Sequence, residues 1–150
     1  MSLEEKVMSL MKDAMKSKDE ATLRGLRAIK AEIIKAKTDP GANGAINEDT
    51  ELKLLQKLVK SRKDSLTIYE QQNRADLAAK EMEEIAVIEK FLPAQMSEEE
   101  VIAAVKEIIA QVGAAGPQDL GKVMGVASKQ LAGKAAGNVI SAAAKNLLTA

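Results

Sequence analysis

The chain has 150 residues, of which 46% are hydrophobic and only 1% aromatic, and its 22 basic residues balance its 22 acidic ones. It has no cysteine and no histidine, which excludes disulfides, thiolate nucleophiles and the usual kinds of zinc site. Aromatic and β-branched runs are scarce, so the composition predicts an all-α fold with an aliphatic core. The balanced charge predicts no general attraction to nucleic acid or membranes.

Two helices are predicted before a loop at residues 38–44. Ser2 and Glu5 have the spacing of a capping box that begins the first helix, and Asp19 is placed to cap the second. The loop is indicated by a proline and two glycines within a polar run.

Two more helices are predicted between this loop and residue 92. Asn47 is placed to cap a long helix reaching about residue 72, and a fourth helix follows a turn at residues 73–74. Pro93 ends the fourth helix because it disfavours helix at the preceding residue. The long patterns on either side of the 38–44 loop predict an antiparallel hairpin, with the first and fourth helices packed alongside. This gives an N-terminal four-helix domain, residues 1–92.

Residues 93–96 are predicted to be a hinge, followed by a three-helix C-terminal domain over residues 97–150. Ser97 and Glu100 form a second capping box, and Gly113 is suited to end the helix that they begin. Pro117 suits the first position of the next helix, which we expect to run to about residue 132. A last helix carries the apolar positions between 139 and 148.

Glycines are concentrated in the C-terminal domain. Gly121 and Gly125 are four residues apart and share one helical face, and each costs about 1 kcal/mol relative to alanine in a helix interior. Such a face favours close approach by another backbone, from either a neighbouring helix or a ligand. Gly133 and Gly137 follow in the same stretch.

Lysines accompany these glycines. Four of them lie between residues 116 and 150, at 122, 129, 134 and 145, against the single acid Asp119. A second group, Lys53, Lys57 and Lys60, forms a stripe on the long third helix. Lysines in this arrangement suit phosphate contacts, and nearby glycines let backbone amides approach a sugar–phosphate chain. The alternative is an ordinary solvated surface with glycines at helix–helix contacts, since this domain has no arginine and no aromatic residue for stacking.

Arg62 falls where the third helix calls for an apolar residue, and Glu81 and Glu84 fall within the apolar arc of the fourth. We expect Arg62 to form a partly buried ion pair with one of these acids, which would fix the register of the two helices. The alternative is an arginine that extends to solvent.

No catalytic constellation is visible in the sequence. The serines lie in no GxSxG or SxxK motif with a plausible base, and no phosphate-binding loop is present. We therefore expect no catalytic residue, no metal and no cofactor. The start of the chain lacks the order of a signal peptide and no apolar run approaches 18 residues, so a cytoplasmic location away from membranes is expected.

The order of several motifs resembles the YqeY family and the related C-terminal tail of the GatB subunit of tRNA-dependent amidotransferases. The likeness covers nearly the whole chain, and its order and spacing are more specific than any single piece. The matching pieces are Leu23–Arg27, Gln56-Lys57 through Arg62–Ser65, Tyr69-Glu70, Arg74–Ala78, Phe91–Pro93 with Gln95, Ser97–Glu100, Asp119–Gly125 and Gly133–Gly137.

This resemblance implies a bacterial-type protein with two helical domains. The second domain would be related to a tail that engages tRNA. It implies a tRNA-associated accessory protein, with Lys122, Lys129 and Lys134 contacting RNA. The family is classed with carbon–nitrogen ligases that use glutamine as amide donor, but that label describes the complex in which the tail occurs, so whether this chain is an enzyme stays open. An amidotransferase or a tRNA-synthetase-type protein is the partner implied. The alternative is a helical protein-interaction adaptor with no RNA role.

One position departs from the family pattern. An acid usually precedes the last glycine of the Gly-basic-Ala-Asp-Gly motif, and Ala136 stands in its place here. An aspartate there would be a natural N-cap for the final helix, so any role of that acid in relatives is in doubt for this chain.

Overall fold

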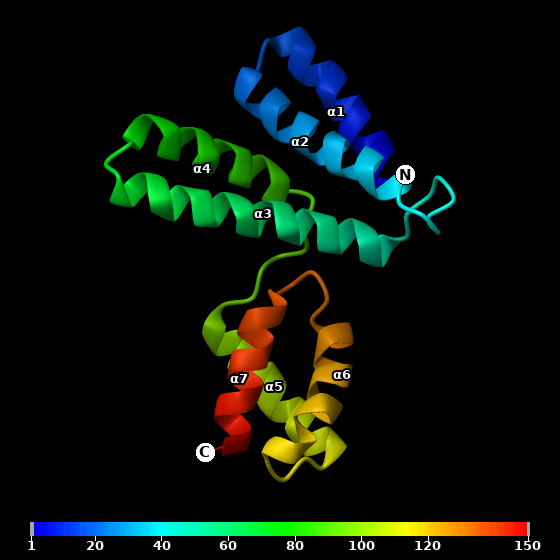
Figure 1. Cartoon of the computed structure of the whole chain (residues 1–150), viewed down its shortest axis with the longest axis vertical. Helices are drawn as coiled ribbons and strands as arrows, with labels where there is room; N and C mark the ends of the chain where they lie inside the picture. Colours follow the sequence, from blue (N-terminus) through cyan, green and yellow to red (C-terminus); the bar gives the residue numbers. More distant parts are fainter. Residues whose placement is uncertain (1, 150) are drawn as a thin grey trace. The chain divides into compact units, whose positions relative to one another are not determined.

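The computed structural model describes residues 2–149, which form seven α-helices and one turn of 3-10 helix, with no strand among them (Figure 1). The predicted all-α class is therefore confirmed. The chain divides into two compact units, one ending at Leu92 and the other beginning at Pro93. Each unit encloses its own hydrophobic core.

The first unit contains α1 (Leu3–Ser17), α2 (Glu20–Lys37), α3 (Glu48–Gln71) and α4 (Ala75–Glu89). The capping box of Ser2 and Glu5 is present, and Asp19 accepts hydrogen bonds from the hydroxyl and the backbone N–H of Thr22. These two bonds favour the carboxylate and lower the pKa of Asp19 from its ordinary value. The helix starts predicted from local side-chain chemistry are confirmed.

The pairing of helices in this unit differs from the sequence prediction. The closely packed hairpins are α1 with α2 and α3 with α4, and α2 packs on α4 more extensively than on α3 (Figure 1). The prediction of a hairpin across the 38–44 loop was wrong. The short turn after α3 forces α3 and α4 to be antiparallel neighbours, whereas the ten residues between α2 and α3 impose no such closeness.

The core of the first unit forms where α2 meets its neighbours. The largest fully buried side chains are those of Val7, Leu26, Ile29, Ile33, Leu55 and Ile88. α2 and α4 lie close together at Gly25, where an added Cβ would lie 2.8 Å from the Cβ of Val87. The glycine is therefore required for this helix crossing.

The buried side of α3 is wide. Leu54, Leu55, Leu58 and Val59 are all buried. The helix packs against both α4 and α2, so it buries two adjacent stripes instead of one.

The second unit contains α5 (Glu98–Val112), the 3-10 turn η1 (Pro117–Asp119), α6 (Leu120–Gln130) and α7 (Gly137–Thr149). The capping box of Ser97 and Glu100 is present, and Gly113 ends α5 with a φ of 68°. The helix predicted from Pro117 begins with the 3-10 turn and ends two residues earlier than expected.

The core of this unit is made of aliphatic side chains, which include Ile108 and Ile140 as well as valines and alanines. Val101, Val105, Val123, Ala127 and Ala144 have no exposed surface. The boundary segment is bound to the same unit, because the Gln95 side chain donates to the carbonyl oxygens of Pro93 and Gly133, and the N–H of Met96 donates to the carbonyl of Lys134.

Within residues 2–149, no helix combines the length and apolarity that crossing a membrane requires. The same residues contain no group of three or more acidic side chains placed to hold a metal ion.

Candidate nucleic-acid interface

One face of α6 combines the lysines and glycines of the C-terminal stretch. Lys122, Gly125 and Lys129 follow one another at spacings of three and four residues, so they lie in line along the helix. Gly121 and Ser128 lie beside them, and all five residues are exposed. We call these five residues the α6 face. The backbone positions of its two lysines, Lys122 and Lys129, are about 10 Å apart along the helix axis.

The only charged side chains on the α6 face are the two lysines. Neither Lys122 nor Lys129 forms an ion pair or a hydrogen bond within the described chain, so both ammonium groups are available to a ligand. The one acid in this part of the sequence, Asp119, accepts a hydrogen bond from the N–H of Ala115 at 2.9 Å. That bond holds the turn before α6 and keeps the carboxylate at the start of the helix, away from Lys129.

The glycines of the α6 face do not serve helix packing. An added Cβ at Gly121 or Gly125 would meet no atom within 4 Å, and the same holds for Gly137 at the start of α7. The interpretation of these three as helix–helix contacts is therefore excluded for residues 2–149. Their missing side chains leave the backbone open to solvent, where another molecule can approach it.

Gly133 has a different role. It is buried, has a φ of 76° and offers its carbonyl to the Gln95 side chain. It therefore shapes the turn before α7 and does not belong to the open surface. The neighbouring Lys134 is exposed, so it can reach a ligand.

The final helix begins at Gly137, directly after Ala136, whose carbonyl accepts from the N–H groups of Val139 and Ile140. Ala136 thus occupies a position from which an aspartate could cap the helix, and alanine has no side-chain oxygen to do so.

The second group of lysines lies on the exposed side of α3 in the first unit. Lys53, Lys57 and Lys60 are all exposed, and Lys60 is 3.3 Å from the carboxylate of Asp64. These lysines belong to the first unit, and the α6 face belongs to the second.

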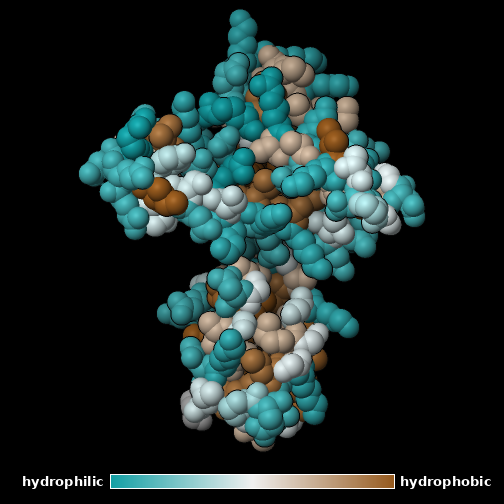
Figure 2. Space-filling view, in the orientation of Figure 1, coloured by the Kyte–Doolittle hydropathy of each residue, from teal (hydrophilic) through white to brown (hydrophobic). Residues whose placement is uncertain are grey.

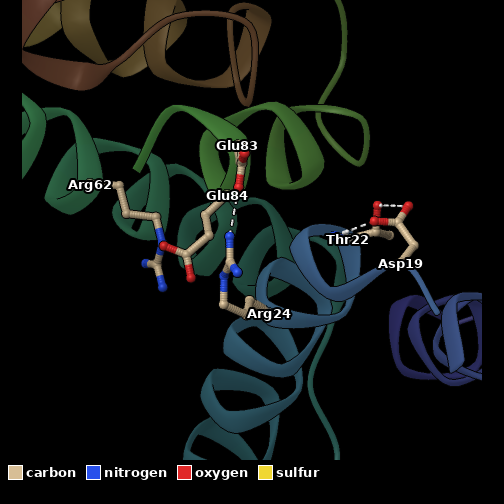
Figure 3. Close-up of polar contacts among 6 residues, drawn as sticks. All are labelled: Asp19, Thr22, Arg24, Arg62, Glu83 and Glu84. Atoms are coloured by element: carbon tan, nitrogen blue, oxygen red, sulfur yellow. Dashed lines mark hydrogen bonds and ion pairs between the residues drawn. The ribbon is translucent and has the colours of Figure 1, made fainter. Parts of the chain in front are cut away.

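Arg62 lies between α3 and α4 with its side chain only 19% exposed, and its Nε is 3.7 Å from an oxygen of Glu84, which is 17% exposed (Figure 3). Glu81 lies nearby with one buried carboxylate oxygen that has no hydrogen-bond partner. Burial raises the pKa of Glu81, the charge of Glu84 raises it further, and Arg62 opposes both. This cluster connects two helices of the first unit.

A neighbouring ion pair was not singled out from the sequence. Arg24 on α2 donates to Glu83 on α4 at 2.6 Å (Figure 3). They are 59 residues apart in the chain, and only the crossing of α2 and α4 brings them together, so no sequence signal indicated that they pair. Ser128 was also not singled out from the sequence, but it could have been. It lies three residues after Gly125, and this spacing places it on the α6 face.

These observations define a class: an all-α protein of two helical units, with a lysine- and glycine-bearing surface on the second. The family model described as "Yqey-like protein" matches residues 4–148. The chain therefore belongs to the YqeY-like family. It is also 30% identical over 128 residues to altered inheritance of mitochondria protein 41, mitochondrial, of Pyrenophora tritici-repentis, covering 83% of this chain and 68% of that protein.

Proposed function

We propose that this protein is a tRNA-associated accessory protein, resembling the tail of a glutamine-dependent tRNA amidotransferase, that binds RNA through the α6 face and performs no chemistry alone. The observation that carries the proposal is the row Lys122, Gly125 and Lys129, where two unpaired ammonium groups flank a stretch of bare backbone. Lysines contribute attraction to phosphates, and the glycine lets a sugar–phosphate chain come close to the helix.

The chemistry of the α6 face favours backbone contacts over reading of bases. The second unit has no aromatic residue on which a base could stack and no arginine to form a paired contact with a guanine. Binding should therefore depend on phosphate positions and on salt, with little preference for one nucleotide sequence.

Filter binding of bulk tRNA across a salt series tests the proposal. The affinity of the intact protein should fall steeply as salt rises, and Lys122→Glu with Lys129→Glu should reduce the slope of log affinity against log salt by about 2. The control is Lys12→Glu with Lys16→Glu on α1, which changes the net charge equally at exposed positions of the first unit. Equal losses in the two variants, or no binding at low salt, would contradict the proposal.

A protein-interaction adaptor is the second candidate. The observation that favours it is the exposed methionines of α1, Met8 and Met15, which are 43% and 53% exposed. Flexible methionine side chains suit apolar partner surfaces. Absence of tRNA binding at low salt would leave this candidate as the stronger one.

A further inference from the structure

The second unit has an apolar groove that the α6 face does not use. It lies between α5 and α7 with a volume of about 480 Å³, and Met96, Val101, Ala142 and Leu147 are among the side chains that line it. Ile102 and Val139 also line the groove and are 36% and 37% exposed, so two branched aliphatic side chains face water. In the space-filling view, brown atoms reach the surface of this unit between hydrophilic ones (Figure 2).

Among the charged residues of α5, one acid and the only base lie at equal distances from Ile102. Glu98 lies one turn before Ile102 and Lys106 lies one turn after it, so an acid, an apolar residue and a base follow each other along one face. Glu98 and Lys106 are exposed, and neither forms an ion pair within the described chain. The two charges are about 12 Å apart along the axis, with Ile102 midway between them.

An acid and a base at equal distances from a central apolar residue make a surface that is complementary to itself. If two copies meet with their α5 helices antiparallel at Ile102, Glu98 of each copy faces Lys106 of the other. Such a two-fold contact uses the same residues on both sides, as isologous dimers do. It also removes Ile102 and Val139 of both copies from water.

We propose that the occupant of this groove is a second copy of this chain, held by Ile102 at the centre and by two Glu98–Lys106 pairs at the ends. One stripe on each of two short helices is smaller than the roughly 800 Å² per partner of a standard stable interface. The dimer is therefore weak and reversible, and it forms at high protein concentration.

Sedimentation equilibrium of the full chain over a range of concentrations tests the proposal. The average mass should rise from 16.0 kDa toward twice that value as the concentration increases. Glu98→Lys and Lys106→Glu should each weaken self-association at least tenfold, because each places like charges opposite one another. The double variant carrying both changes should restore it to within about threefold of the unaltered protein, since the pairs are then re-formed with the charges exchanged.

Glu107→Lys is the matched control for Glu98→Lys. It makes the same charge change at an exposed position of α5, but Glu107 lies on the other side of the helix from Ile102, so self-association should be preserved. Ile102→Asp should abolish association, and circular dichroism would establish that each variant remains helical. The proposal is overturned if the unaltered protein stays monomeric at the highest concentration, or if the double variant is as weak as the single ones. These residues differ from those of the α6 face, so the RNA proposal and this one can fail separately.

Discussion

At the scale of single residues, the ion pair of Arg62 and Glu84 illustrates how a charged side chain is tolerated between packed helices. Both side chains retain a small exposed fraction, and the pair has Glu81 as a second acid beside it. The arginine thus offsets two partly desolvated carboxylates at once. Removing it would leave both without a cation.

Arg62→Met should lower the free energy of unfolding by about 1–3 kcal/mol, as expected when a largely buried charged group loses its partner. The loss is smaller than the roughly 3–5 kcal/mol of a fully buried pair because water still reaches both groups. Urea denaturation measures it. Arg74→Met is the control, since the Arg74–Asp76 pair is exposed and its loss should leave stability unchanged. If both variants unfold at the same urea concentration, the structural role of Arg62 is refuted.

Glu81 should make stability depend on pH. Its folded-state pKa is raised above the usual 4.5, so its contribution to stability is fully present below that value and is lost as pH rises through the raised pKa. Glu81→Gln removes this loss. The variant should therefore gain stability relative to the unaltered protein at pH 7, and the gain should disappear below about pH 4.5.

Paired urea titrations at pH 4 and pH 7 measure this effect, with the exposed Glu70→Gln on α3 as a control that should show no such gain. A Glu81→Gln variant that is equally stabilised at both values would mean that desolvation of the carboxylate is not the cause.

At the scale of elements, helix ends could be predicted more reliably than helix partners. Capping boxes, an Asp cap and a terminal glycine depend on side chains within a few residues, so Ser2, Asp19, Ser97 and Gly113 indicated helix ends directly. Which helices pack together depends on contacts between distant residues. The short turn at residues 73–74 does indicate that α3 and α4 are neighbours. The crossing of α2 and α4, and the Arg24–Glu83 contact that follows from it, had no local signal.

In the candidate site, too, local spacing could be predicted and the surroundings of each residue could not. Helical spacing alone is enough to place Lys122, Gly125 and Lys129 on one face. Whether the glycines face a neighbouring helix or solvent could not be decided from spacing, because both surroundings accept a missing side chain. Gly133 was grouped with them from its position in the motif, and only its φ and its bond to Gln95 separate it.

Replacing Gly25 or Gly125 with alanine should change the stability of the protein in opposite directions. Gly25→Ala should destabilise the protein by about 1–3 kcal/mol, because the new Cβ would lie 2.8 Å from Val87 and force α2 and α4 apart. Gly125→Ala should instead stabilise it by up to about 1 kcal/mol, since the position is helical, exposed and surrounded by open space.

Thermal melting of the two variants checks this prediction against the unaltered chain. A destabilised Gly125→Ala would mean that an atom approaches this glycine more closely than the structure shows. An unchanged Gly25→Ala would mean that Val87 can move aside without cost.

At the scale of the whole molecule, the two units have separate hydrophobic clusters, one around Ile29 and Ile88 and the other around Val105 and Val123. A single aliphatic core in under sixty residues is near the lower limit of independent folding. The second unit nevertheless buries several side chains completely.

Residues 93–150 expressed alone should fold into a helical, cooperatively melting domain with a stability of only a few kcal/mol. Far-ultraviolet circular dichroism with a thermal melt measures this. The same fragment carrying Val105→Asp should be unfolded, because a carboxylate would enter the centre of the core. A spectrum typical of an unfolded chain for the unaltered fragment would show that the second unit depends on the first.

The bonds of Gln95 and Met96 to residues 133 and 134 have a mechanical consequence. They hydrogen-bond the first residues of the second unit to the loop that precedes α7. Neither segment can therefore become disordered without breaking its bonds to the other. A pulling force applied to the chain at Gln95 and Met96 would act directly on the backbone of Lys134. The junction and the loop should therefore gain or lose order together.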